Sequence, residues 1–364
     1  MFLKTLKNVK RSHSLYICST NQHVFFTLIK CMKSSVPTDI VICDDIPDAY
    51  RLMDSLLSSG LFRHVYFFSR ERSPGYNPNG ILAKIFFRHY IHRKIVEREF
   101  KVDLSRYNNI FIYHDGIKLG RYLQDVKQVY HLIEDGVDFL IDIDKTPSVI
   151  DLPPTNKFVF FLKYFFNIGY LPCGQGRYCK SIEVNKNTGL KITHKNIIEK
   201  PRAAMIDSLN IKEKKHIFDI FVRTEMLSYS HAGRKTALVL TIPLYSDGYV
   251  YEMDMQRQIY DDLISELKEK EYLIVIKPHP RDVMDYVTMY PDLSFIDKSV
   301  PTEVLNFKSE LRFDLAVTIL SSSILHIKIA GEKIRHGYSY MRRYPHFITP
   351  RVNKMIVQEM EGNV

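Results

Sequence analysis

The sequence feature that most constrains the fold is a regular alternation of short apolar runs with longer amphipathic stretches. Runs that are apolar at nearly every position are typical of strands buried on both faces of a parallel sheet. The amphipathic stretches between them are typical of covering helices, so the pattern predicts repeated β-strand–α-helix–β-strand units. In the first part of the chain we expect strands at residues 15–18, 39–43, 64–68, 109–113 and 128–133, and helices near residues 21–34, 47–59, 80–98 and 117–125.

The same alternation returns in the last third of the chain, beginning with KTALVLTIPL at residues 235–244. It predicts a second domain of the same type. We expect strands at residues 237–242, 272–277, 293–296 and 314–320, a helix near residues 251–270, and further helices after residues 281, 302 and 323. The expected fold class is therefore α/β, with two Rossmann-like domains that face an interdomain cleft.

The intervening segment does not follow the alternation. It starts with DLPPTNK, continues with the phenylalanine-rich FVFFLKYFFNIGYLP at residues 158–172, and then becomes basic and polar. The aromatic part has two interpretations: a buried packing helix, or an interfacial segment that touches lipid or a lipid-linked acceptor. We therefore expect a Rossmann-like domain at residues 1–150, a linker or insertion at residues 151–234, and a second Rossmann-like domain at residues 235–364.

The charge balance bears on the choice of partner. The 364-residue chain has 51 Lys and Arg residues against 41 Asp and Glu residues, a net charge of +10. Such an excess favours nucleic acid, anionic lipid or phosphorylated substrates, although scattered solubilising lysines would give the same number. Because the chain has no zinc-finger, aromatic RNA-binding or helix-turn-helix signature, we expect peripheral contact with an anionic membrane surface and no nucleic-acid partner.

Apolar runs and cysteines predict the compartment. No apolar run reaches the ~18 to 20 residues that a membrane-spanning helix needs, and the basic N-terminus lacks the apolar core of a secretory signal. The cysteines are odd in number and show no CxxC spacing, so neither a disulfide framework nor a structural zinc site is indicated. They are Cys18, Cys31, Cys43, Cys173 and Cys179. We expect a cytoplasmic protein.

One histidine lies between two prolines at the end of an expected strand, in YLIVIKPHPRD at residues 272–282. In doubly wound sheets, ligands bind beyond the carboxyl ends of the strands. Pro278 favours extended geometry at Lys277, Pro280 does the same at His279, and we expect a helix to start at Pro280. The imidazole of His279 could donate a hydrogen bond to an anionic oxygen or act as a general acid. The alternative is a structural histidine.

A run of three serines follows another expected strand. Ser321, Ser322 and Ser323 come after FDLAVTIL and precede ILHIKIAG, which we expect to be helical. Serine hydroxyls and free N–H groups at a helix start can bind phosphate. Plain N-capping is the alternative, although capping needs only one serine.

Acidic residues follow the expected strands of the first domain. Glu134 and Asp135 precede Gly136 in a turn, and one of the two carboxylates could take a proton from an acceptor hydroxyl. An ordinary acidic turn is the alternative. Asp115 and Asp247 lie in similar Asp-Gly turns and are competitors for this role. The segment IDID, with Asp142 and Asp144, resembles a DxD metal motif, but patterns this short occur by chance.

Together these motifs resemble those of the bacterial lipooligosaccharide sialyltransferase family. The acidic turn is similar to its D/E-D/E-G motif, His279 and Pro280 to its H-P motif, and the serine run to its serine-rich motif. LYICSTNQHVF at residues 15–25 and LVLTIPL at residues 238–244 are similar to further stretches of that family. The chain differs at Asn21, where the family typically has proline, and at Ile242, where it often has glutamine.

The resemblance implies a GT-B fold and an inverting transfer of sialic acid from CMP-sialic acid, with no metal or other cofactor. The implied acceptor is a galactose-terminated lipid-linked glycan of lipooligosaccharide, O-antigen or capsule, at the inner face of the bacterial cell membrane, and a homodimer is possible. His279 would hydrogen-bond or protonate the departing phosphate, and Glu134 or Asp135 would activate the acceptor, with Asp247 as a rival. The resemblance assigns five residues to nucleotide and phosphate binding: Ser321, Ser322, Ser323, Lys277 and Pro280. It assigns three residues to the acceptor side: Gly136, Thr20 and Gln22.

Two other classes of function compete with this interpretation. One is another GT-B transferase, such as a CDP-glycerol glycerophosphotransferase or a UDP-sugar glycosyltransferase. The other is a non-enzymatic basic protein that binds membrane or nucleic acid. The second class leaves the polar residues at the strand ends without a role.

Overall fold

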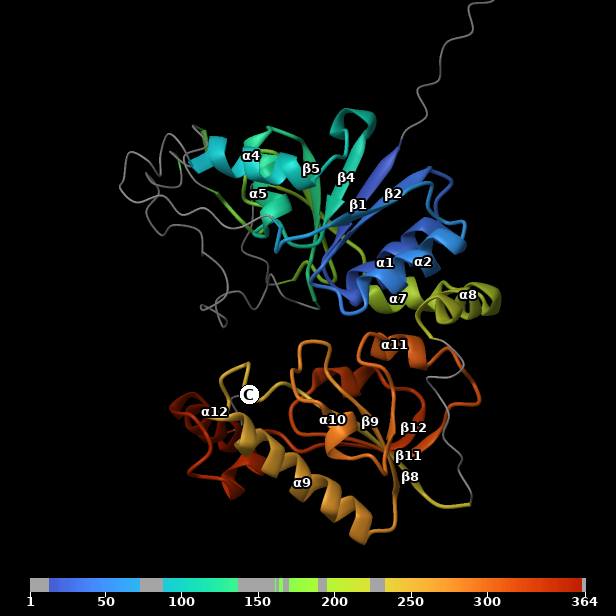
Figure 1. Ribbon diagram of the computed structural model, residues 1–364, viewed down its shortest axis with the longest axis vertical. Coiled ribbons are helices and arrows are strands. Elements are labelled where there is room, and N and C mark those ends of the chain that lie inside the picture. Colours follow the sequence, from blue (N-terminus) through green and yellow to red (C-terminus); the bar gives the residue numbers. More distant parts are fainter. Residues whose placement is uncertain are drawn as a thin grey trace, which may run out of the picture. The chain divides into compact units, whose positions relative to one another are not determined.

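The computed structural model describes residues 13–72, 88–136, 170–188, 195–222 and 233–361, together with Phe161, Tyr164 and Phe165. The chain forms two compact units, Met1–Glu213 and Lys214–Val364. Each unit is built on its own parallel sheet with helices packed against it (Figure 1). The α/β class with two Rossmann-like units, predicted from the alternating pattern, is confirmed.

In the described residues, the sheet of the first unit has seven strands in the order β3-β2-β1-β4-β5-β6-β7. All of its strand pairs are parallel. This is the strand order of a Rossmann fold with one strand added at the edge. The strands are β1 (Ser14–Cys18), β2 (Thr38–Cys43), β3 (Val65–Phe68), β4 (Asn109–Ile112), β5 (Tyr130–Ile133), β6 (Cys179–Val184) and β7 (Asn196–Glu199).

Helices cover both faces of this sheet. Figure 1 shows α1 (Asn21–Met32) and α2 (Ala49–Ser58) on one face and α4 (Arg88–Glu99) and α5 (Lys118–Asp125) on the other. Helix α1 is buried along most of its length, as expected beside the central strand β1. The unit also contains η1 (Leu104–Arg106) and α7 (Arg202–Asp207), and α8 (Ile211–Phe221) leads into the second unit.

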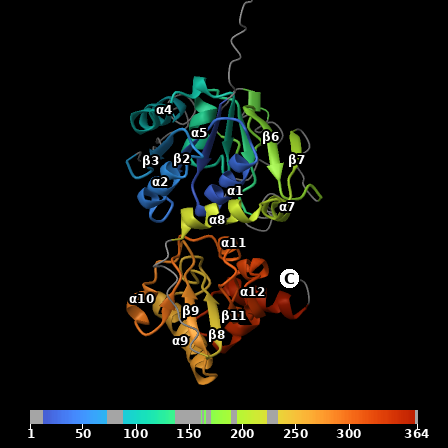
Figure 2. The same cartoon turned by 90° about the vertical axis from the view of Figure 1, so that its right-hand side faces the viewer.

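The segment expected as a linker, residues 151–234, contributes structure to the first unit. Strands β6 and β7 extend the sheet at the edge opposite β3 (Figure 2). Strand β7 is an edge strand and is largely exposed, so its sequence NIIE lacks the continuous apolar character of a central strand. The first unit therefore extends to Glu213 rather than ending at residue 150.

The sheet of the second unit has five parallel strands in the order β10-β9-β8-β11-β12. Its order again reverses beside the first strand in sequence, here β8. The strands are β8 (Thr236–Leu240), β9 (Leu273–Lys277), β10 (Ser294–Phe295), β11 (Phe313–Thr318) and β12 (Ala330–Arg335). The helical elements are α9 (Met253–Glu269), α10 (Tyr286–Met289), α11 (Thr302–Leu305), η4 (Ser322–His326), η5 (Tyr338–Arg343) and α12 (Pro350–Met360).

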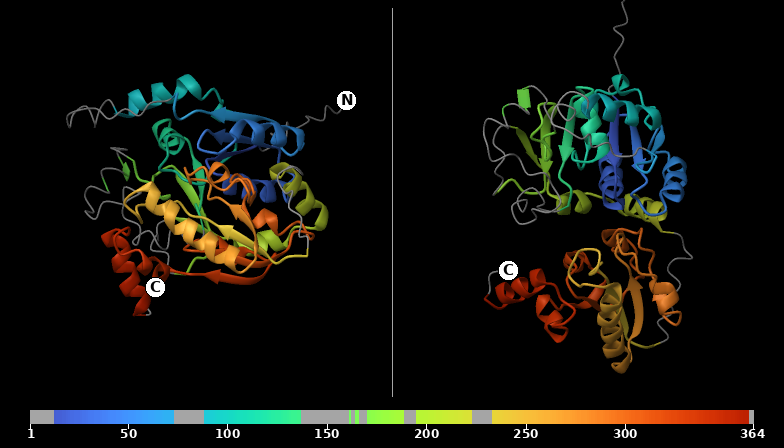
Figure 3. Two further views of the ribbon diagram at one scale, coloured as in Figure 1. Left: turned by 60° about the horizontal axis from the view of Figure 1, so that its bottom comes forward. Right: turned by 60° about the vertical axis from the view of Figure 1, so that its left-hand side comes forward.

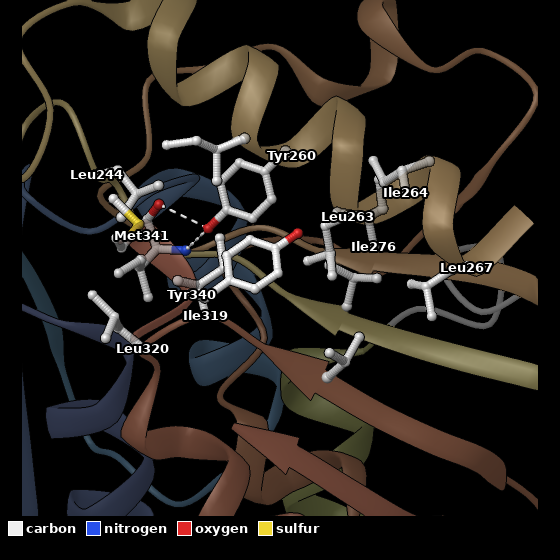
Figure 4. Packing of buried hydrophobic residues seen from close by; sticks show 14 of the residues in the cluster. Leu244, Tyr260, Leu263, Ile264, Leu267, Ile276, Ile319, Leu320, Tyr340 and Met341 are labelled. Atoms are coloured by element: carbon white, nitrogen blue, oxygen red, sulfur yellow. Dashed lines mark hydrogen bonds between the residues drawn. The ribbon is translucent and has the colours of Figure 1, made fainter. Parts of the chain in front are cut away.

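Helix α9 supplies much of the core of the second unit. Its buried residues recur at helical spacing, and Tyr260, Leu263, Ile264 and Leu267 face the strands (Figure 4). Burying such side chains contributes about 1.5 to 3 kcal/mol each. The last helix, α12, packs against η5 at one side of this unit (Figure 3).

Two expected helices of the second unit have a different structure. No helix starts at Pro280: Pro280 and Arg281 form a turn closed by the N–H of Asp282, which donates to the His279 carbonyl at 2.9 Å. The helix begins only at Tyr286, where the Asp285 side chain caps it. Ser321 caps the five-residue 3₁₀ helix η4, which begins with Ser322 and Ser323, and the chain then enters strand β12.

Candidate active site

His279 lies immediately beyond the carboxyl end of β9, and its backbone is tied to the neighbouring strand. Its N–H donates to Thr241 Oγ1 at 3.1 Å, and Thr241 follows β8. On the ring, Nδ1 accepts the backbone N–H of Arg281 at 3.1 Å. Because Nδ1 is an acceptor, the neutral imidazole carries its proton on Nε2. The ring can therefore donate one hydrogen bond from Nε2.

The protonation state of His279 follows from its surroundings. Burial lowers the pKa of its imidazole to about 4; the nearby charges of Arg281 and Lys277 act in the same direction, while Asp247 opposes them. At neutral pH the unliganded protein therefore carries a neutral imidazole. Of the two roles expected for His279, hydrogen-bond donation fits this state better than proton donation.

A buried carboxylate supports the His279 loop from beneath. Asp282 is 2% exposed and accepts hydrogen bonds from Thr241 Oγ1 at 3.3 Å, Gln256 Nε2 at 3.1 Å and Tyr286 Oη at 2.8 Å. Thr241 thus accepts from His279 and donates to Asp282. This network was not predicted from the sequence, although an aspartate two residues after the H-P pair was a visible signal.

Tyr260 fixes the loop that carries Thr241. Its hydroxyl accepts the N–H of Ile242 at 2.7 Å and donates to the Ile242 carbonyl at 3.1 Å (Figure 4). The ring is fully buried in the α9 core. The packing of α9 is therefore linked through one side chain to the position of the strand end at β8.

Lys277 and Pro280 flank the histidine in different environments. Lys277 is 4% exposed, and burial lowers the pKa of its ammonium to about 8, although Asp297 and Glu303 favour the charged form. Among the described residues Lys277 has no ion-pair partner within 4.0 Å, and a buried ammonium of this kind is suited to an anionic ligand. Pro280 is exposed and serves the turn.

Of the three serines, Ser321 caps η4, while Ser322 and Ser323 are accessible to solvent. Ser321 is buried; its N–H donates to Thr318 Oγ1 at 3.2 Å, and its hydroxyl accepts the N–H of Ser323 at 3.3 Å. Ser322 is exposed and Ser323 is half-buried. Strand β11, which leads to them, neighbours β8. Ser322, Ser323, Thr241 and His279 therefore follow three adjacent strands at one edge of the sheet.

Asp247 is engaged by an arginine. Arg281 donates to both carboxylate oxygens, Nη1 to Oδ1 at 2.7 Å and Nη2 to Oδ2 at 3.1 Å. A bidentate guanidinium stabilises the carboxylate and engages both of the oxygens that a general base would use. Asp247 therefore orients Arg281, which lies two residues after His279 in the chain.

The two acids of the turn in the first unit have opposite orientations. Glu134 is 1% exposed, its Oε2 accepts the N–H of Asn185 at 2.8 Å, and its carbonyl accepts from Arg202. The side chain of Asp135 is 31% exposed, and its Oδ1 is 2.8 Å from His23 Nε2. Gly136 has φ of 79°, a conformation in which glycine is favoured. Glu134 therefore holds the ends of β5 and β6 together, while the side chain of Asp135 is accessible to a ligand.

The charge state of Asp135 results from opposing effects. Burial raises the pKa of its carboxyl, but the hydrogen bond from His23 and the charges of His114 and Arg202 outweigh the effect of burial, so the net pKa is below the usual value. Asp135 is therefore a carboxylate at neutral pH.

The residues expected on the acceptor side lie at the start of α1. Thr20 Oγ1 accepts the N–H of His23 at 3.2 Å and so caps the helix. Gln22 is half-buried in the first turn. His23, the next residue, was missed by the sequence analysis although it lies within LYICSTNQHVF.

The other acidic residues considered from the sequence are Asp115, Asp142 and Asp144. Asp115 is buried, its carboxylate accepting from Tyr130 Oη at 2.8 Å and from the N–H groups of Cys173 and Gly174 at 2.7 and 2.9 Å. Asp142 and Asp144 lie outside the described residues. Within the described ranges, no group of three His, Cys, Asp or Glu side chains is arranged to hold a metal ion.

The sequence profile of glycosyltransferase family 52 matches residues 83–335. The chain belongs to glycosyltransferase family 52. The match covers both the acidic turn and the H-P and serine motifs, and it confirms the resemblance to bacterial sialyltransferases drawn from those motifs. An uncharacterised protein of Haemophilus influenzae is 30% identical over 86 residues, which span 24% of this chain and 27% of that protein.

Solved structures similar to this chain include two bacterial sialyltransferases. The GT-B domain of a Photobacterium damselae sialyltransferase matches with a TM-score of 0.51 at 15% identity, covering 87% of this chain and 88% of that one. An α/β-galactoside α-2,3-sialyltransferase of Photobacterium phosphoreum gives 0.48 at 12% identity, covering 89% of both chains. The first likeness identifies the architecture of this family 52 enzyme as GT-B.

Proposed function

We propose that this family 52 enzyme transfers sialic acid from CMP-sialic acid to a hydroxyl of a galactose-type residue, with inversion at the anomeric carbon. The observation that carries the proposal is the state of His279. A neutral imidazole with its proton on Nε2 follows the end of β9, and Ser322 and Ser323 follow the end of β11 in the same sheet. These groups are suited to a nucleotide monophosphate.

The leaving group is CMP, which departs with its single phosphate when the bond between the anomeric carbon and the phosphate oxygen breaks. Hydrogen bonds to that oxygen stabilise the charge that develops there. In our proposal His279 donates from Nε2, Ser322 and Ser323 donate from their hydroxyls, and Lys277 supplies positive charge. Arg281, held by Asp247, adds a second cation close to His279.

We assign the general base to Asp135. It takes the proton of the acceptor hydroxyl while the hydroxyl oxygen forms the new bond to the anomeric carbon. Glu134 is less suited, because it is buried and hydrogen-bonded within the first unit. Asp247 is less suited, because both of its oxygens accept from Arg281.

The acceptor class in our proposal is a galactose-terminated, lipid-linked surface glycan, which places the enzyme peripherally on the inner face of the cell membrane. Exposed aromatic side chains support surface contact: Tyr90 is 61%, Phe161 46% and Phe165 54% exposed. Lys195 lies 5.3 Å from the ring of Tyr164, the residue next to Phe165 in the chain. Aromatic and basic residues together favour an anionic lipid surface. Within the described part of the chain, every helix is too short or too polar to cross a membrane.

Nucleotide preference tests the donor assignment. We expect CMP to raise the melting temperature of the protein more than CDP or UDP, since ligand at ~100 times Kd stabilises by about 2.7 kcal/mol. A preference for UDP would contradict the assignment and favour a UDP-sugar enzyme. A CMP response with turnover of CDP-glycerol, and none of CMP-sialic acid, would indicate a glycerophosphotransferase.

A further inference from the structure

A chain of hydrogen bonds connects three elements at the carboxyl edge of the first sheet. Ser19 follows β1, His23 is in the first turn of α1, and Asp135 follows β5. His23 Nδ1 is 3.2 Å from the backbone nitrogen of Ser19 and 3.3 Å from its Oγ. His23 Nε2 is 2.8 Å from Asp135 Oδ1.

The donors in this chain determine where the imidazole proton lies. The Ser19 N–H can only donate, so Nδ1 of a neutral His23 is the acceptor and Nε2 carries the proton. The Nε2–H therefore donates to Asp135. The ring is held flat against Tyr113, with centroids 4.3 Å apart and planes at 7°. Tyr113 is itself fixed by a 3.0 Å hydrogen bond between its hydroxyl and Thr27 Oγ1.

We propose that His23 is a positioning residue for Asp135, fixing the carboxylate through Oδ1 so that Oδ2 receives the proton of the acceptor hydroxyl. The proposal rests on the assignment of Asp135 as the base. Oδ2 makes no hydrogen bond to any described residue, and the side chain is 31% exposed, so a ligand can reach it. His23 itself is 3% exposed and has no such access.

Two other charged or titratable groups act on Asp135 from neighbouring elements. They are His114, which follows β4, and Arg202, which begins α7, whereas the adjacent Glu134 is oriented to the other side of the turn. His114 Nδ1 accepts the N–H of Gly116 at 3.0 Å, and Arg202 donates to the Glu134 carbonyl. Among the described residues, only His23 makes a hydrogen bond to the Asp135 carboxylate. Its removal should therefore change both the orientation and the titration of the base.

The test compares pH profiles of kcat/KM for transfer in wild type, His23→Phe and His23→Gln. Phe keeps the ring against Tyr113 and removes the donor, so we expect the acid limb to move up by roughly one pH unit. A misplaced base should also lower kcat by roughly 10²-fold. Gln restores a donor near the Nε2 position and should recover the wild-type limb. His64→Phe, beside Asp39 at the opposite edge of the same sheet, is the matched control and should leave the profile unchanged. An unmoved acid limb in His23→Phe would overturn the proposal.

A second measurement separates this inference from the proposed reaction. Long-range ¹H–¹⁵N spectra of the histidine rings report which nitrogen carries the proton, without any substrate. We expect His23 to have its proton on Nε2 and its resonances to shift in Asp135→Asn. A proton on Nδ1 would overturn the inference even if sialyl transfer is found. If sialyl transfer is absent and the expected spectra are found, the proposed function fails while the His23–Asp135 pair stands.

Discussion

The hydroxyl of Thr241 accepts the backbone N–H of His279 at 3.1 Å, which joins the ends of β8 and β9 at the candidate phosphate site. The same hydroxyl donates to the buried Asp282. The backbone position of His279 is therefore fixed by hydrogen bonds that lead through Thr241 to the buried carboxylate of Asp282.

Thr241→Val should weaken donor binding. The substitution keeps the shape and leaves the His279 N–H and one Asp282 lone pair without a partner, at a cost of about 1 to 3 kcal/mol in the free energy of unfolding. We expect a similar loss of stability and no loss of CMP affinity for Thr236→Val, whose buried hydroxyl donates to Asp314 at the other end of β8. Urea unfolding and CMP titration measure both. Equal CMP affinity of the two variants would contradict the role of Thr241.

Asp135→Asn and Glu134→Gln should separate catalysis from stability. Asp135→Asn removes the proposed base, so we expect transfer to fall by ~10² to 10⁴-fold while the melting temperature changes little. Glu134→Gln replaces the charged acceptor of the Asn185 N–H with a weaker neutral one, so we expect a lower melting temperature. Transfer by Asp135→Asn at the wild-type rate would exclude Asp135 as the base.

Lys277→Met should stabilise the protein and weaken CMP binding. Burial lowers the pKa of Lys277 to about 8, so the unfolded chain binds more protons than the folded one between pH 8 and the ordinary lysine value. Wild-type stability should therefore rise as pH increases through this window, and Lys277→Met should not show this contribution. Lys270→Met, at an exposed lysine of the same unit, is the control. Tighter CMP binding by Lys277→Met would contradict a ligand-binding role.

The titration of His279 should make the free energy of unfolding depend on pH in the acidic range. Its pKa is lowered to about 4, below the ordinary histidine value, so the unfolded state binds more protons in this interval. The contribution of His279 to stability is thus full above the unfolded pKa and is lost as pH falls towards 4. Urea unfolding at pH 7 and pH 5 should show a smaller loss of stability for His279→Gln than for wild type. A larger loss in the variant would show that the folded-state pKa is raised instead.

The sequence predicted the strands where the strands are buried. SLYIC and TALVL are apolar at nearly every position because β1 and β8 are central in their sheets, and both were found close to the expected bounds. Strand β7 was not predicted, because an exposed edge strand such as NIIE does not need a continuous apolar pattern. The length of the first unit was underestimated for the same reason.

The candidate site was predicted in its residue types more than in its geometry. Sequence alone could not separate Glu134 from Asp135, because adjacent residues point to opposite sides of the chain and only the fold determines which side is interior. Thr241 lies far along the chain from His279, and His23 lies far along the chain from Asp135, so sequence alone does not pair them. Asp282 is close to His279 in sequence but has no motif of its own. The helix expected at Pro280 did not form, since the buried Asp282 draws the chain inward before α10 begins.

The central claim is the transfer of sialic acid with His279 at the leaving phosphate. Its most direct test is incubation of wild type and His279→Ala with CMP-sialic acid and a panel of galactose-terminated acceptors, with the products analysed by mass spectrometry. We predict an acceptor product heavier by one sialic acid residue and release of CMP with wild type, and a loss of at least about 10²-fold with His279→Ala at an unchanged melting temperature. Absence of both transfer and donor hydrolysis in wild type, or transfer by His279→Ala at the wild-type rate, would contradict it.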